Sequence, residues 1–94
     1  MKEQDIQKKI VKHLEKQGAY TVKVISASKA GVPDVLVCYK GRFIGVEVKT
    51  PKTINNVSKL QTFNIAKIQE AGGLAGVASC VEEADALLKL VDNL

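Results

Sequence analysis

Hydrophobic positions along the chain follow the helical period in three segments and the strand pattern in four. Ile6, Ile10 and Leu14 repeat at intervals of four and make one apolar stripe, which Glu3 and Gln7 continue. The predicted helices cover residues 3–17, residues 58–71 and the segment that follows Ser79-x-x-Glu82. The predicted strands cover residues 20–25, 34–39, 42–49 and 74–79.

The order of these segments, α-β-β-β-α-β-α, predicts an α/β fold built on one mixed sheet. Three strands in succession favour an antiparallel meander, and a fourth strand reached through a helix should lie parallel to one of them. Strands 34–39 and 42–49 are apolar on both faces, so we expect helices on both faces of the four-stranded sheet. Residues 1–94 are expected to form a single domain.

Composition narrows the class of protein. No apolar run reaches the roughly 18 residues of a membrane span, and the charged, amphipathic first residues do not resemble a secretory signal. Cys38 and Cys80 lie in apolar stretches, which predicts buried free thiols and a reduced cytoplasmic compartment. One histidine and no CxxC spacing argue against a structural zinc site.

Charge is distributed unevenly along the chain. Residues 21–69 hold eight basic side chains and two acids, Asp34 and Glu47, within a net charge of +4. This balance predicts nucleic acid as a partner, although a solvated lysine-rich surface has the same composition. Four lysines of the first helix are expected on its solvated face, unless a dimer turns them toward DNA: Lys8, Lys9, Lys12 and Lys16.

The hairpin around Lys40-Gly41 brings the two isolated acids together. With a two-residue turn, Tyr39 faces Arg42, and the same register sets Asp34 opposite Glu47. Lys49 projects from that face as well, because side chains alternate along a strand. A bulge at Gly41 would shift this register by one residue.

Two adjacent carboxylates repel each other, and a divalent cation such as Mg²⁺ relieves that repulsion. An ion on Asp34 and Glu47 would activate water and polarise a phosphoryl oxygen, while Lys49 stabilises the developing charge. Loop residues beside the site would hold a nucleic-acid backbone: Ser28, Lys29, Lys52 and Lys59. The alternative is a surface ion pair between a carboxylate and Lys49, which contributes little to stability.

Pro33-Asp34, twelve residues, then Glu47-Val48-Lys49 resembles the PD-(D/E)xK nuclease signature. The chain as a whole resembles a stand-alone virus-type replication-repair nuclease (VRR-NUC) domain. The matching motifs are Glu3-x-x-Ile6-Gln7, Gly31-Val32-Pro33-Asp34, Val46-Glu47-Val48-Lys49-Thr50, Ser58-x-x-Gln61 and Ala71-Gly72-Gly73. The resemblance implies a restriction-endonuclease-like αβββαβ core. It also implies a Mg²⁺- or Mn²⁺-dependent endonuclease on branched DNA, acting in DNA repair or recombination.

The resemblance also assigns roles to residues. Asp34, Glu47 and the Val48 carbonyl would bind the metal, and Lys49 would be the catalytic lysine. Glu3 would reach the metal directly or through water, or it is only a favourable anion in a first helical turn. Gln61 would lie near the attacking water, or it serves only the capping box, or it does both.

The family's small viral and bacterial members resemble homodimeric Holliday-junction resolvases. The leading expectation is therefore a homodimeric resolvase in the cytoplasm of a bacterial or phage-infected cell, with the last helix as a candidate interface. The alternatives are a flap- or nick-cutting nuclease module, a non-catalytic domain that binds branched nucleic acid, or a dimeric scaffold.

Overall fold

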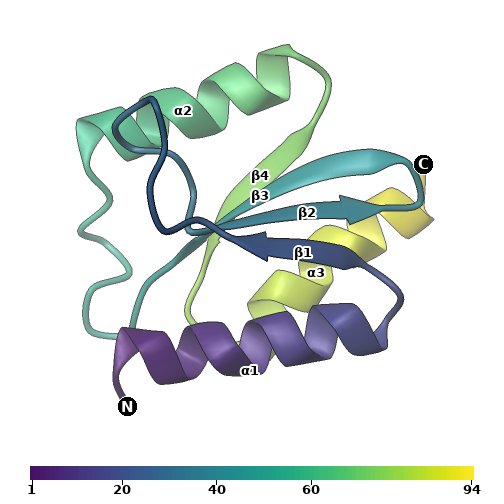
Figure 1. Cartoon of the computed structure of the whole chain (residues 1–94), viewed down its shortest axis with the longest axis horizontal. Helices are drawn as coiled ribbons and strands as arrows, with labels where there is room; N and C mark the ends of the chain where they lie inside the picture. Colours follow the sequence, from purple (N-terminus) through teal and green to yellow (C-terminus); the bar gives the residue numbers. More distant parts are fainter.

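The computed structural model describes residues 1–94 and contains three helices and four strands. In chain order the elements are α1 (Glu3–Lys16), β1 (Tyr20–Lys23), β2 (Val35–Tyr39), β3 (Arg42–Val48), α2 (Lys59–Glu70), β4 (Leu74–Ala78) and α3 (Val81–Asp92) (Figure 1). The predicted order of elements is confirmed. None of the helices is long and apolar enough to cross a membrane.

The strands form one mixed sheet in the order β1-β2-β3-β4. The pairs β1–β2 and β2–β3 are antiparallel, whereas β3 and β4 are parallel because α2 connects them as a crossover. Tyr39 pairs with Arg42, so the predicted hairpin register is confirmed. Lys40 and Gly41 both have positive φ, 50° and 79°, as a two-residue type I′ turn requires, and no bulge shifts the pairing.

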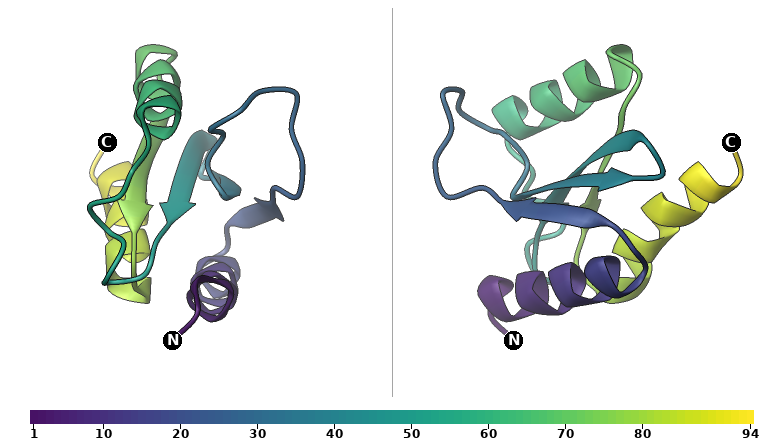
Figure 2. Two further views of the ribbon diagram at one scale, coloured as in Figure 1. Left: turned by 90° about the vertical axis from the view of Figure 1, so that its left-hand side faces the viewer. Right: turned by 45° about the vertical axis from the view of Figure 1, so that its right-hand side comes forward.

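One face of the sheet carries the hydrophobic core. Helices α1 and α3 cover this face, and Figure 2 shows both on the side of the sheet away from α2. The core is made of aliphatic side chains from these helices and from the inward positions of β2 and β3, including Ile10, Leu14, Val35, Ile44 and Leu88. His13 on α1 and Asp85 on α3 join the two helices through a contact of 2.8 Å between Nε2 and Oδ1.

The opposite face is only half covered. Helix α2 packs on β3 and β4, and it approaches closely because Gly45 has no side chain: a Cβ there would lie 2.9 Å from Ile68 Cδ1. The β1–β2 half is left open, with Tyr20 71% and Val22 42% exposed. The prediction of helices on both faces therefore holds, but α2 is too short and too far toward β4 to cover the whole face.

The prediction that Cys38 is buried is wrong, because Cys38 lies on the uncovered half of this face. Cys38 is exposed on the open face rather than buried, because no helix lies above β2, and Cys80 is partly buried. Both thiols are free, as predicted.

The last helix begins one residue later than the motif Ser79-x-x-Glu82 predicts. Its N-cap is Cys80, and Glu83 rather than Glu82 accepts from the Ser79 amide and hydroxyl, each at 2.7 Å. Its apolar face, with Ala84, Leu88 and Val91, is buried in the core. That face is therefore not available as the interface proposed from the sequence.

The loop between β1 and β2 leads directly into Asp34, and it is fastened to α2. Gly31 has φ +82° and lies so close to the helix that a Cβ would stand 2.7 Å from the Leu60 carbonyl carbon. The Asn64 amide donates to the Ala30 carbonyl oxygen at 3.0 Å. The start of α2 and the approach to Asp34 are thus fixed against each other.

We expect Gly31→Ala to destabilise the protein more than Gly18→Ala does. Both glycines have positive φ, +82° and +96°, but nothing lies within 4 Å of a Cβ at Gly18. A left-handed conformation costs an L-residue about 1–2 kcal/mol, and at Gly31 the Leu60 backbone must also move. Urea denaturation of the two variants measures the difference, and equal losses would show that the loop-to-helix contact is not tight.

Candidate active site

The two isolated acids lie at the open end of the β2–β3 hairpin. Asp34 precedes β2, and its Oδ2 accepts a hydrogen bond of 2.8 Å from the Val48 amide on β3. Its main-chain oxygen accepts from the Val24 amide, also at 2.8 Å. The register that pairs Val35 with Val46 sets Asp34 opposite Glu47 when it is continued by one residue. Backbone pairing on both sides therefore fixes the Asp34 carboxylate beside Glu47.

Glu47 is the most unusual side chain in the site because it is a carboxylate with only 2% of its surface exposed. Its Oε2 accepts a hydrogen bond of 2.9 Å from the Gln61 amide nitrogen and lies 3.9 Å from the Lys49 ammonium. Its Oε1 is buried and has no hydrogen-bond partner. A buried charged oxygen without a partner is costly, so this atom marks a place where a ligand fits.

Burial raises the pKa of Glu47 to about 8, and the negative charge of the neighbouring Asp34 carboxylate adds to the increase. The Lys49 ammonium opposes the increase in pKa, and the more distant Glu3 carboxylate adds a small part to it. The site thus disfavours negative charge on Glu47 unless a positive charge compensates it.

A divalent cation fits this arrangement. It would neutralise both carboxylates and give the unpartnered Glu47 Oε1 a ligand, and Mg²⁺ typically uses one or two carboxylates together with water. No group of three or more His, Cys, Asp or Glu side chains gathers around one point. The carboxylates available to such an ion at this point are therefore those of Asp34 and Glu47.

Gln61 combines the two roles considered for it from the sequence. Its amide oxygen accepts from the Ser58 amide at 2.9 Å, while its own backbone amide donates to the Ser58 hydroxyl at 3.1 Å, so the capping box is complete. Its amide nitrogen donates to Glu47. The orientation of the side-chain amide follows from chemistry, since a backbone N–H requires an acceptor and a carboxylate requires a donor. The start of α2 is therefore joined to the buried carboxylate.

Lys49 and Glu3 occupy different positions around this centre. Lys49 projects from the same face of β3 as Glu47, and its side chain is only 14% exposed. Glu3 lies in the first turn of α1 and is exposed. It is near enough to influence the Glu47 pKa, so its role toward a metal stays a prediction.

The residues predicted to bind DNA lie in the two loops that flank the site. Ser28 and Lys29 are exposed in the β1–β2 loop. Lys52 is exposed in the β3–α2 loop, and Lys59 is the exposed first residue of α2. No carboxylate lies within ion-pair distance of these three lysines, so their charges are available to an external anion.

One residue that shapes the site was not singled out from the sequence. Asn64 fastens the loop before Asp34 to α2. No signal in the sequence pointed to it, because its partner is a backbone atom 34 residues away.

Comparison with known proteins identifies a similar fold among solved structures. No model of a protein family and no curated protein matches the sequence. Among solved structures, the chain is similar to one described as a VRR_NUC domain, with 25% sequence identity and a TM-score of 0.75. The match covers 93% of this chain and 94% of that one.

Without divalent metal, we expect the free energy of unfolding to decrease as the pH rises from about 4.5 to about 8. The folded-state pKa of Glu47 lies above its ordinary value of 4.5. Its contribution is therefore fully present below pH 4.5 and is lost as the pH passes the folded-state value. The loss should be on the order of a few kcal/mol, since one pKa unit corresponds to about 1.4 kcal/mol.

Urea denaturation in EDTA across this pH range measures the effect. Glu47→Gln should flatten the profile, whereas Glu70→Gln, which removes an exposed carboxylate from α2, should not. Identical profiles for the wild type and Glu47→Gln would contradict the assignment.

Proposed function

Because this chain has the fold of a VRR_NUC domain, which is a nuclease-like fold, we propose that it is a metal-dependent endodeoxyribonuclease that hydrolyses phosphodiester bonds in branched DNA. The observation that carries the proposal is the buried, unpartnered Oε1 of Glu47 beside Asp34 and Lys49. A pure binding module would have no use for two adjacent acids, one of them buried, in a DNA-facing site, because they repel phosphate.

The metal would be Mg²⁺, with Mn²⁺ able to replace it, held by Asp34, Glu47 and the Val48 carbonyl, with Glu3 acting directly or through water. Such an ion supplies Lewis-acid activation of water and of the phosphoryl oxygen. The Val48 amide holds the Asp34 carboxylate in place, and Gln61 holds that of Glu47.

Lys49 and Gln61 would act on the reacting groups themselves. The Lys49 ammonium is desolvated and lies beside Glu47, so it can stabilise negative charge on the phosphoryl oxygens in the transition state. The Gln61 amide nitrogen has two hydrogens and uses one of them on Glu47. The second is free to orient the attacking water, while Ser28, Lys29, Lys52 and Lys59 hold the DNA backbone.

We further propose that the active form is a homodimer that resolves Holliday junctions in the cytoplasm of a bacterial or phage-infected cell. One domain of this size has one active site, so paired cuts on two strands require two copies related by a twofold axis.

The surface that fits a second copy is the open sheet face, which we define as Tyr20, Val22, Leu36, Cys38 and Phe43. These side chains surround a shallow hollow of about 200 Å³, and none of them is charged, so the surface does not suit DNA. Phe43 is 46% exposed and Tyr20 71%. A twofold axis through this face would bury the same residues from both copies.

Cleavage of end-labelled DNA tests the nuclease proposal. We expect paired, symmetric cuts in a four-way junction with Mg²⁺ or Mn²⁺, and none in EDTA. Asp34→Asn and Lys49→Ala should each lower the rate by at least about 100-fold, as the loss of electrostatic stabilisation does elsewhere. Flap, nicked and linear duplexes should be cut more slowly.

Ser58→Ala and Gln61→Ala form a matched pair in this assay. Each removes one of the two hydrogen bonds of the capping box, in which the loss of the N-cap side chain costs about 0.5–2 kcal/mol, but only Gln61→Ala also removes the contact with Glu47. Only Gln61→Ala should therefore lower the cleavage rate. Cutting of flaps alone would keep the nuclease and remove the resolvase, whereas binding without cutting would leave a binding domain.

Sedimentation velocity tests the dimer. We expect a dimer that Val22→Glu or Phe43→Glu dissociates, because each buries an unpaired charge in the interface. Leu90→Glu is the matched control, since Leu90 is also an exposed hydrophobic residue, 54% exposed, but lies on α3. A wild-type monomer at all concentrations, or a dimer that only Leu90→Glu dissociates, would contradict the proposed interface.

A further inference from the structure

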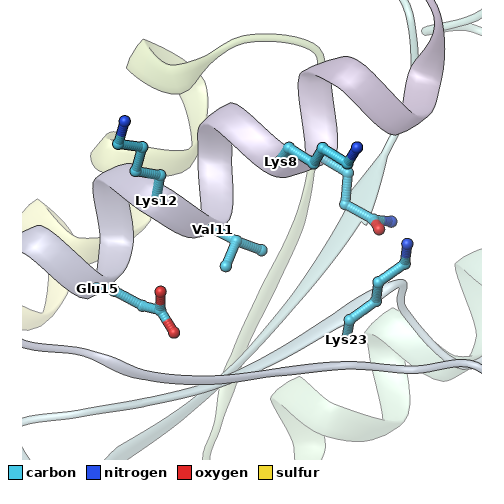
Figure 3. Close-up of a pocket in the computed structure, with 6 residues that line it drawn as sticks. Lys8, Val11, Lys12, Glu15 and Lys23 are labelled. Atoms are coloured by element: carbon cyan, nitrogen blue, oxygen red, sulfur yellow. The ribbon is translucent and has the colours of Figure 1, made fainter.

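A basic cavity lies between α1 and β1, outside the set of residues assigned above to catalysis and DNA binding. Its volume is about 360 Å³, and its lining consists of Gln7, Lys8, Val11, Lys12, Glu15 and Lys23. Figure 3 shows Lys8 and Lys12 on successive turns of α1, and Lys23 reaching toward the helix from the neighbouring strand. We call it the α1–β1 cavity.

The positive charge in the α1–β1 cavity has no counterion within the protein. None of its three lysines lies within ion-pair distance of a carboxylate. Its one acid, Glu15, accepts a hydrogen bond of 2.9 Å from the Thr21 hydroxyl, which fastens α1 to β1. Lysines that line one cavity repel each other through their like charges, and an anion reduces that repulsion.

The Gln7 amide also lines the cavity. Its side chain forms none of the hydrogen bonds within the protein, and 8% of its surface is exposed. Its NH₂ group is therefore free to donate to an anion in the cavity, and it suits a phosphate oxygen. The amide and the lysines together therefore specify an anion that accepts hydrogen bonds.

The two elements that form the cavity lead to the candidate active site through Glu3, proposed above to act on the metal, and through the pairing of β1 with β2. Glu3 begins the same helix, and with a rise of about 1.5 Å per residue Lys8 and Lys12 follow it by about 7 Å and 14 Å along the axis. Lys23 pairs with Val35, the residue after Asp34. At about 3.4 Å per nucleotide of duplex, these distances correspond to roughly two to four nucleotides.

We infer that the α1–β1 cavity binds an internal backbone phosphate of the DNA strand that leaves the active site along α1. Lys8, Lys12 and Lys23 neutralise this phosphate, and the Gln7 amide donates to it. The inference rests on the proposed function and extends it. The contact lies on the side of the sheet opposite to α2, so DNA that is held both there and at Lys59 must extend around the end of the hairpin. A straight duplex follows one side, whereas a branched one has arms for both.

Binding without cleavage tests this inference. Fluorescence anisotropy in EDTA, over about 50–200 mM salt, would compare wild type, Lys8→Gln/Lys23→Gln and Lys9→Gln/Lys16→Gln on a four-way junction and a linear duplex. The two variants lose the same charge, but Lys9 and Lys16 do not line the cavity. Circular dichroism would establish that all three proteins are folded.

We expect the Lys8/Lys23 variant to lose about tenfold in affinity for the junction. Its slope of log affinity against log salt should fall by about one, because the cavity is inferred to bind one phosphate and each phosphate contact contributes about 0.9 to the slope. The Lys9/Lys16 variant should lose less than twofold. Removing terminal phosphates from the DNA should change nothing, because the cavity is inferred to bind an internal phosphodiester.

Equal losses in the two variants, with wild type still cutting DNA, would overturn the cavity and keep the nuclease. An effect confined to DNA ends that carry a phosphate would overturn the internal contact in favour of a terminal one. A loss specific to Lys8/Lys23 without cleavage in any metal would keep the cavity and remove the nuclease. No binding of DNA by wild type would overturn both.

Discussion

The hydrogen bond between Gln61 and Glu47 is the contact on which the site depends. It joins the first turn of α2 to a carboxylate on β3, and the capping box fixes the amide from its other side. Because a buried carboxylate is costly, each group around Glu47 must be placed accurately. Gly31 and Asn64 hold the loop before Asp34 against the same helix, so α2 supports the positions that the sheet gives to both acids.

The parts of the fold that could be predicted from the sequence depend on local rules. The period of Ile6, Ile10 and Leu14 and the Lys40-Gly41 turn each involve a few neighbouring residues, and the hairpin register follows from the turn. That register is why Asp34 and Glu47 could be placed side by side in advance. The start of α3 was off by one because Ser79 has two acids within reach, and Glu83 rather than Glu82 is its partner.

What could not be predicted depends on how far one element extends over another. The sequence of β2 is apolar on both faces, but it carries no information on whether α2 reaches it, so Cys38 was expected to be buried and is exposed. The role of Asn64 and the α1–β1 cavity could not be predicted for the same reason. Asn64 binds a residue of a distant loop, and the lining of the cavity comes from two different elements. From the sequence, Lys8 and Lys12 were expected on an ordinary solvated helix face. In the structure they line one cavity together with Lys23 of β1.

Helix α2 has no fully buried residue. Its attachment therefore rests on partly exposed contacts: Gln61 with Glu47, Asn64 with Ala30, Leu60 against Gly31, Ile68 against Gly45 and Gly73, and Gln69 with the Ala75 carbonyl oxygen. An element held in this way opens more readily than the α1–α3 core. Every ligand that binds Glu47 in its ordered position must then stabilise α2 as well, by the linkage between binding and local unfolding. Amide hydrogen exchange in α2 is accordingly a direct reporter of occupancy at a site that the helix backbone does not touch.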